Sequence, residues 1–150
     1  MVKFVQTVQV QRPVDEVFAS WADLERSPEW AAPVLERRKL TDGPVAVGTR
    51  FLARDRFPGR EVEFELEITA LETDQHMAAE WFEPMGGGWD ATFVEAEGGC
   101  RVTLEASMEP TGVMKMLSPI VAPWARRQMR KDLDSFKQLL ESGGGKESAT

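Results

Sequence analysis

The sequence contains few of the residues on which many catalytic and metal sites depend. Its 150 residues include one cysteine, one histidine and no tyrosine. The single Cys100 excludes a disulfide within the chain and leaves no second thiol to share a metal ion. The single His76 excludes a two-histidine metal site and leaves this residue a lone acid/base role at most. We therefore expect neither a metal nor a cofactor.

Long apolar runs and an excess of positive charge are also missing. No stretch approaches the ~20 apolar residues that a membrane-spanning helix requires, and the N-terminus does not resemble a signal peptide. The formal net charge of −7 opposes binding to phosphate backbones and to anionic lipid headgroups. The one basic cluster is interleaved with Asp132 and Asp134, which is typical of a solvated helix face; it comprises Arg126, Arg127, Arg130 and Lys131. We expect a cytoplasmic protein with no membrane span and no nucleic-acid partner.

The residues that are present are typical of one globular domain. With 42% hydrophobic and 29% charged residues, a chain of this length buries roughly 70% of the surface that it exposes when unfolded. Five tryptophans, eight phenylalanines and seven methionines make the interior aromatic and rich in sulfur. Such an interior suits flat apolar ligands, although most of these side chains are expected to form the core.

Periodicity predicts the order of the elements. Residues 3–11 alternate as in a β-strand that Pro13 ends. An apolar stripe with helical spacing follows Pro13, and Ser27-Pro28 marks the start of a second short helix. Turn signals divide residues 31–108 into six further strands. A last long helix is expected from Met114 to Glu141, bent near two internal prolines, before a disordered tail at 143–150.

The clearest strand covers residues 61–68, where four glutamates alternate with apolar residues. This alternation predicts one wet and one buried sheet face, the buried one formed by Val62, Phe64, Leu66 and Ile68. The expected hairpin partner, residues 50–57, places arginines opposite these glutamates. It also places Asp55 on the buried face, where a carboxylate must either pair with a cation or take up a proton.

This order of elements resembles the START-like or SRPBCC superfamily, in particular its polyketide cyclase/dehydrase and lipid-transport branch, over residues 2–142. The matching segments are Arg12-Pro13-Val14 with Val17-Phe18, Trp21 to Asp23, Trp30, Gly48-Thr49-Arg50, Gly98 to Leu104, and Leu133 to Leu140. The resemblance implies an α+β helix-grip fold. In it, a curved seven-stranded antiparallel sheet wraps around the C-terminal helix, with two short helices between strands 1 and 2, and encloses an apolar cavity. Residues 1–142 would form this single domain.

The predicted cavity has both apolar and polar candidates. We expect it to be lined by Phe51, Phe64, Leu66, Trp81, Phe93, Leu104, Met116, Ile120, Trp124 and Met129. Asp55 is the candidate catalytic residue, with pairing to an arginine as the alternative. His76 is expected in a turn or on the surface, Cys100 beside a turn without a catalytic role, and Gly86 to Gly88 in a flexible connection between strands.

The sequence is compatible with three functions of different classes. The first is a noncatalytic module, monomeric or homodimeric, that binds an apolar lipid-, polyketide- or aromatic-like molecule. The second is an aromatase/cyclase-type enzyme in which Asp55 moves protons during closure of a poly-β-ketone. The third, implied by co-chaperone members of the superfamily, is protein binding through the outer glutamate and arginine face.

Overall fold

The computed structural model describes residues 2–83 and 86–142, and for Val113 and Met114 the backbone alone. One antiparallel sheet of seven strands has the order β1-β7-β6-β5-β4-β3-β2. Its strands are β1 (Val2–Val10), β2 (Val34–Lys39), β3 (Arg50–Phe57), β4 (Arg60–Glu72), β5 (His76–Trp81), β6 (Gly86–Ala96) and β7 (Gly99–Glu109). The helices are α1 (Val14–Ala22), the 3-10 helix η1 (Leu24–Glu29) and the long α2 (Val113–Glu141). The predicted helix-grip fold is confirmed.

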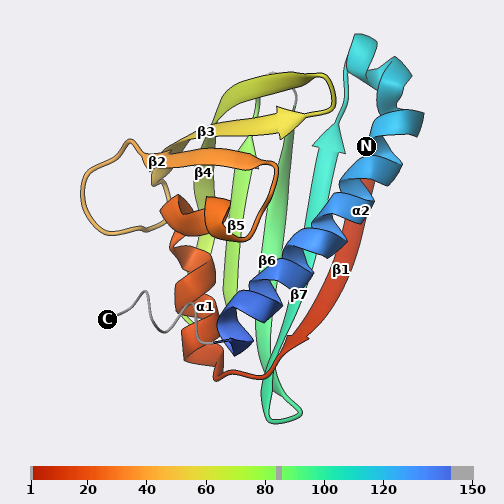
Figure 1. Ribbon diagram of the computed structural model, residues 1–150. Helices are drawn as coiled ribbons and strands as arrows, with labels where there is room; N and C mark the ends of the chain where they lie inside the picture. The colour runs from red at the N-terminus through yellow and green to blue at the C-terminus, as the bar shows by residue number, and fades with distance from the viewer. Residues whose placement is uncertain (1, 84–85, 143–150) are drawn as a thin grey trace.

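All helices lie on one face of the sheet, which we call the inner face (Figure 1). The sheet curls so that β2 and β3 run across the direction of β6 and β7, and α2 crosses the inner face diagonally over β1 and β7 (Figure 1). Alternation along β4 is as predicted, with Leu66 and Ile68 buried and Glu63 and Glu65 exposed. The sequence period of two therefore assigns the two faces of this strand correctly.

The core lies where α1 and α2 meet the sheet. α1 buries Val17, Phe18 and Trp21, three of the four residues of the predicted apolar stripe, and the fourth, Val14, is partly exposed. Trp21 contacts the ring of Phe136 on α2 edge-on, with 5.3 Å between ring centroids. This aromatic contact joins the two helices directly and, with the sheet below, fixes the position of the last turns of α2.

Helix α2 remains continuous through Pro119 and Pro123. Its axis changes direction in the first turns, which project past the ends of the strands before the helix crosses the sheet (Figure 1). Proline removes a backbone donor and crowds the preceding turn, which accounts for a bend at this place. The predicted tail at 143–150 lies outside the described residues.

The glycines at 86–88 do not form the predicted flexible connection. They pair within β6, with Gly87 opposite Trp81 on β5 and Met108 on β7. A Cβ at Gly87 would lie 2.6 Å from the Ser107 carbonyl oxygen and 2.8 Å from the Trp81 ring. Close packing on both sides, rather than mobility, explains this glycine.

Candidate functional site

Burial on the inner face decreases along the strands toward the end at which α2 begins. On β3, Phe51 and Ala53 are buried, whereas Asp55 and Phe57 are partly exposed. On β5, Met77 and Ala79 are buried, whereas Trp81 is partly exposed. The same change occurs on β4, β6 and β7, where Val62, Phe64, Trp89, Ala106 and Met108 are partly exposed. The apolar face is thus only half covered at this end.

The half-covered region is strongly aromatic, and we call it the aromatic end. It comprises Phe57, Val62, Phe64, Trp81, Trp89 and Met108 of the sheet with Trp124 of α2. Phe64 and Trp81 lie 5.6 Å apart between ring centroids on neighbouring strands. Trp124 of α2 lies 6.0 Å from Phe57 at the end of β3. Helix and sheet therefore both contribute aromatic side chains with exposed surface to one apolar region.

An ion pair between β2 and β3 lies beside these rings. Arg37 donates hydrogen bonds to both carboxylate oxygens of Asp55, one of them over 3.2 Å. The side chains are only 10% and 16% exposed. The guanidinium of Arg37 also lies over the ring of Phe64, 5.7 Å from its centroid. Asp55 thus fixes the position of the Arg37 guanidinium, and the pair places charged hydrogen-bonding groups at the edge of an apolar surface.

A second carboxyl group, Asp132 of α2, lies near enough to this pair to sense its charge. Its Oδ1 accepts hydrogen bonds from the Ala32 backbone N–H over 3.2 Å and from Gln128 over 2.9 Å. Burial raises the pKa of Asp132, and the negative charge of Asp55 raises it further, against the opposing effect of the two hydrogen bonds. Asp132 therefore takes up a proton more readily than an exposed aspartate does.

The structure separates the ten predicted lining residues into three groups. Four are partly exposed, namely Phe64, Trp81 and Trp124 at the aromatic end and Met129, which packs against the core. Four are buried in the core, namely Phe51, Leu66, Phe93 and Leu104. The last two, Met116 and Ile120, are exposed on α2 and do not face the interior, so their prediction as lining residues was wrong. They belong to the first part of α2, whose first turns project past the ends of the strands (Figure 1).

Several residues of this region were missed by sequence reasoning. Arg37 follows an irregularity between Val34 and Glu36 in the pairing of β2 with β3, so strict alternation does not assign its face. Asp132 was interpreted as part of a solvated helix face, yet it turns inward to Ala32. The predicted alternative for Asp55, pairing with an arginine, is what the structure contains.

The single histidine and the single cysteine, His76 and Cys100, lie away from the aromatic end. His76 is on the outer face, between Asp90 at 2.8 Å and Glu72 at 3.3 Å. The hydrogen bond to Asp90 is the main cause of the raised pKa of His76, and it outweighs the effect of burial. Cys100 is a buried free thiol whose pKa is raised by burial, which makes it unreactive.

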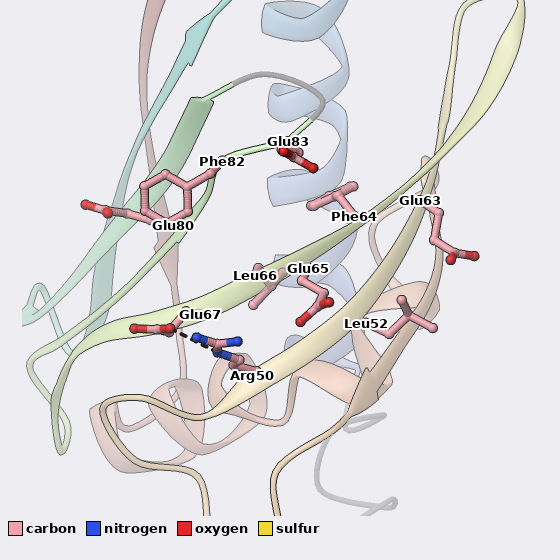
Figure 2. A pocket seen from close by; sticks show the side chains of 10 residues that line it. All are labelled: Arg50, Leu52, Glu63, Phe64, Glu65, Leu66, Glu67, Glu80, Phe82 and Glu83. Atoms are coloured by element: carbon pink, nitrogen blue, oxygen red, sulfur yellow. Dashed lines mark hydrogen bonds and ion pairs between the residues drawn. The ribbon is translucent and has the colours of Figure 1, made fainter.

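The outer face has a hollow of about 560 Å³ over β3, β4 and β5. Figure 2 shows its acidic lining, with Glu63, Glu65, Glu67, Glu80 and Glu83 around it. Arg50 pairs there with Glu67 over 3.2 Å, as the predicted cross-strand arrangement requires. Among the described residues no group of three or more potential ligands has the geometry to hold a metal ion. This hollow is too strongly charged to suit an apolar ligand.

Comparison with protein families matches residues 1–141 to a family described as polyketide cyclase/dehydrase and lipid transport. The chain belongs to the polyketide cyclase/dehydrase and lipid transport family. None of the curated proteins matches the sequence. The family accounts for the helix-grip architecture, and within the described residues no helix has the length and apolar character needed to cross a bilayer.

Solved structures support the same fold for this family member. TTHA0849 from Thermus thermophilus is 15% identical, with a TM-score of 0.79 over 91% of this chain and 95% of its own. Ara h 8.0201 is 14% identical, with a TM-score of 0.72 over 94% and 98%. The Zhui aromatase/cyclase from Streptomyces sp. R1128 is 15% identical, with a TM-score of 0.72 over 95% and 94%. At these identities the similarity concerns the fold.

Proposed function

We propose that this member of the polyketide cyclase/dehydrase and lipid transport family binds an apolar small molecule at the aromatic end, without converting it. The observation that supports this most directly is the loss of burial along the inner face, which leaves Phe64, Trp81 and Trp124 partly exposed in one region. Each 100 Å² of apolar surface removed from water contributes about 2.5 kcal/mol. A flat or chain-like ligand that covers these rings therefore gains affinity without many polar contacts.

The Arg37–Asp55 pair would orient such a ligand. Both oxygens of Asp55 accept hydrogen bonds from Arg37, so the carboxylate holds the guanidinium in position beside Phe64. Remaining N–H groups of Arg37 are available to a carbonyl, hydroxyl or carboxylate of the ligand. We place the protein in the cytoplasm, because a single buried free thiol agrees with a reducing compartment.

Two measurements test the binding proposal. Native mass spectrometry of the purified protein is expected to find a co-purifying apolar compound, and fluorescent fatty-acid or polyaromatic probes are expected to bind saturably. Trp81→Ala should weaken probe binding at least about tenfold, because the ring contributes a large apolar contact area. Phe82→Ala is the matched control, since Phe82 is the next residue, 72% exposed and part of the outer hollow.

Failure of every probe to bind would contradict the proposal, as would an equal loss of affinity in Trp81→Ala and Phe82→Ala. Thermal unfolding of both variants verifies that they are folded at the assay temperature. With this control, the comparison distinguishes the inner face from the outer one.

An aromatase/cyclase-type activity on a polyketide-like substrate is the second candidate. It is favoured by the two neighbouring carboxyl groups on β3 and α2, one of which, Asp132, has a raised pKa. If Asp55 moves protons, Asp55→Asn should abolish turnover of a poly-β-ketone and leave its binding intact. Equal turnover by the variant would exclude this role for Asp55, and Asp132→Asn tests the other carboxyl in the same assay.

A further inference from the structure

The first two thirds of α2 carry positive charge only. Residues 113–131 contain five cations and no carboxylate, in a chain with a net charge of −7. The five cations are Lys115, Arg126, Arg127, Arg130 and Lys131. All five side chains are exposed. This part of the helix is therefore a basic surface on an otherwise acidic protein.

The same stretch exposes large apolar side chains. Met116 is 81% exposed, Ile120 71% and Leu117 40%. With a helical rotation of about 100° per residue, Met116, Ile120, Arg127 and Lys131 fall within about 60° of the helix circumference. Apolar and basic residues thus share one outward face, which we call the α2 outer face.

The five cations of residues 113–131 make no ion pair with an Asp or Glu of the part of the chain that the structure describes. Arg126 instead lies over the ring of Phe4, 5.2 Å from its centroid. Asp132, the carboxylate next to Lys131, accepts hydrogen bonds from Ala32 and Gln128. Asp134 is exposed on the same side of the helix, four residues after Arg130, but no ion pair among the described residues neutralises these cations.

We propose that the α2 outer face docks on an anionic lipid bilayer. Its projecting first turns would insert Met116, Leu117 and Ile120 at the depth of the headgroups, while Arg127, Arg130 and Lys131 face lipid phosphates (Figure 1). A bilayer presents phosphate groups at its surface and acyl chains beneath them. The exposed apolar side chains at the start of α2 suit the acyl chains, and the cations that follow suit the phosphates. A soluble acidic protein would satisfy the cations but offers no reason for the exposed apolar tip.

Docking in this orientation would bring the aromatic end close to the membrane. Trp124 follows Ile120 by one helical turn and contacts Phe57 of the sheet. An apolar molecule leaving the bilayer would therefore meet the proposed binding region first. Membrane docking does not depend on that ligand, and it is tested below without any ligand, so the two proposals can fail independently.

Sedimentation of the full chain with vesicles tests the docking. We expect co-sedimentation with vesicles of phosphatidylcholine and phosphatidylserine in equal parts, and little with phosphatidylcholine alone. Each cation near the surface contributes about a fivefold factor in affinity, so R127E/K131E should weaken binding at least about 25-fold. Met116→Ser with Ile120→Ser should weaken binding to the same vesicles without changing its salt dependence.

A charge-matched control distinguishes the effect of the α2 outer face on vesicle binding from the effect of the net charge of the protein. R56E/R101E changes the total charge equally but on the outer face of the sheet, where both arginines are exposed. Binding of this variant should exceed that of R127E/K131E at least about tenfold. Equal binding of the two variants, equal binding to both kinds of vesicle, or no binding by the wild-type chain would overturn the proposal. Circular dichroism of each variant verifies the fold.

Discussion

Asp55 of β3 receives hydrogen bonds from Arg37 of β2 on both of its carboxylate oxygens, at a place where the sheet is mostly shielded from water. Removing one member leaves the other charge poorly solvated, so Asp55→Ala should lower the free energy of unfolding by about 3 kcal/mol. Urea unfolding at neutral pH measures this change. Arg37→Met should have a similar effect.

The double variant Arg37→Met/Asp55→Ala provides the control for this pair. Because it removes both charges together, it should lose clearly less stability than the two single variants added. If the single effects simply add, the two side chains do not stabilise one another, and the assignment of Arg37 as the group held by Asp55 would be wrong.

Asp132→Asn should stabilise the protein at neutral pH. The raised pKa of Asp132 in the folded state means that folding disfavours its charged carboxylate. The stability contributed by the protonated form is present below the unfolded pKa of about 4, and it is lost as the pH rises through the folded pKa. Asparagine keeps the Oδ1 acceptor for Ala32 and Gln128 without the charge. We expect a gain of up to about 1 kcal/mol at pH 7, decreasing towards pH 4, by urea unfolding at both pH values.

The exposed Asp134, two residues further along α2, is the control for this measurement. Asp134→Asn should change the stability little at either pH. A loss of stability in Asp132→Asn that is larger at pH 7 than at pH 4 would show that the folded protein favours the charged carboxylate, contrary to the prediction.

Gly87→Ala should destabilise the sheet by about 1 to 3 kcal/mol. The new methyl group would press on the Ser107 carbonyl oxygen and on the ring of Trp81, neither of which can move freely. Gly86→Ala is a closely matched comparison, because its methyl group would meet the end of the flexible Glu109 side chain at 3.3 Å. Thermal or urea unfolding that ranks the two variants equally would contradict the packing explanation for Gly87.

His76 should make the stability depend on pH in the opposite sense from a paired carboxylate. Its folded pKa is raised mainly by the hydrogen bond to Asp90, so its contribution is present below the unfolded pKa of about 6.5 and is lost as the pH rises through the folded pKa. The partners are partly exposed, which limits the effect to about 0.2 to 1 kcal/mol. His76→Gln should therefore lose stability at about pH 5.5 and little at about pH 9. A constant difference across this range would rule out the charged pair.

Periodicity predicted the fold because most strands keep a strict period of two and α1 a clear apolar stripe. Alternation places Glu63 outside and Leu66 inside, and the structure agrees. The candidate site was harder to predict, because it depends on how far each inner residue lies from the covering helix. Phe51 and Phe57 have the same place in the strand pattern, yet only Phe51 is fully buried. The sequence period shows which face of the sheet a residue lies on, but not whether a helix covers that part of the face.

The bend and projection of α2 also could not be predicted from the sequence pattern. Met116 and Ile120 were expected to line the cavity, but both are exposed in the first part of α2. The first turns of this helix project past the ends of the strands (Figure 1). Arg37 was missed because the irregularity in β2 interrupts the alternation that would have assigned its face. Both errors arise from tertiary geometry that local patterns do not contain.

The central claim is that an apolar molecule binds at the aromatic end. The indole N–H signals of the five tryptophans, Trp21, Trp30, Trp81, Trp89 and Trp124, report on it directly in two-dimensional NMR spectra. Titration with a fluorescent polyaromatic or fatty-acid probe that binds the protein should shift the signals of Trp81, Trp89 and Trp124 most strongly and saturably. Saturable binding that leaves these three signals unchanged would contradict the account.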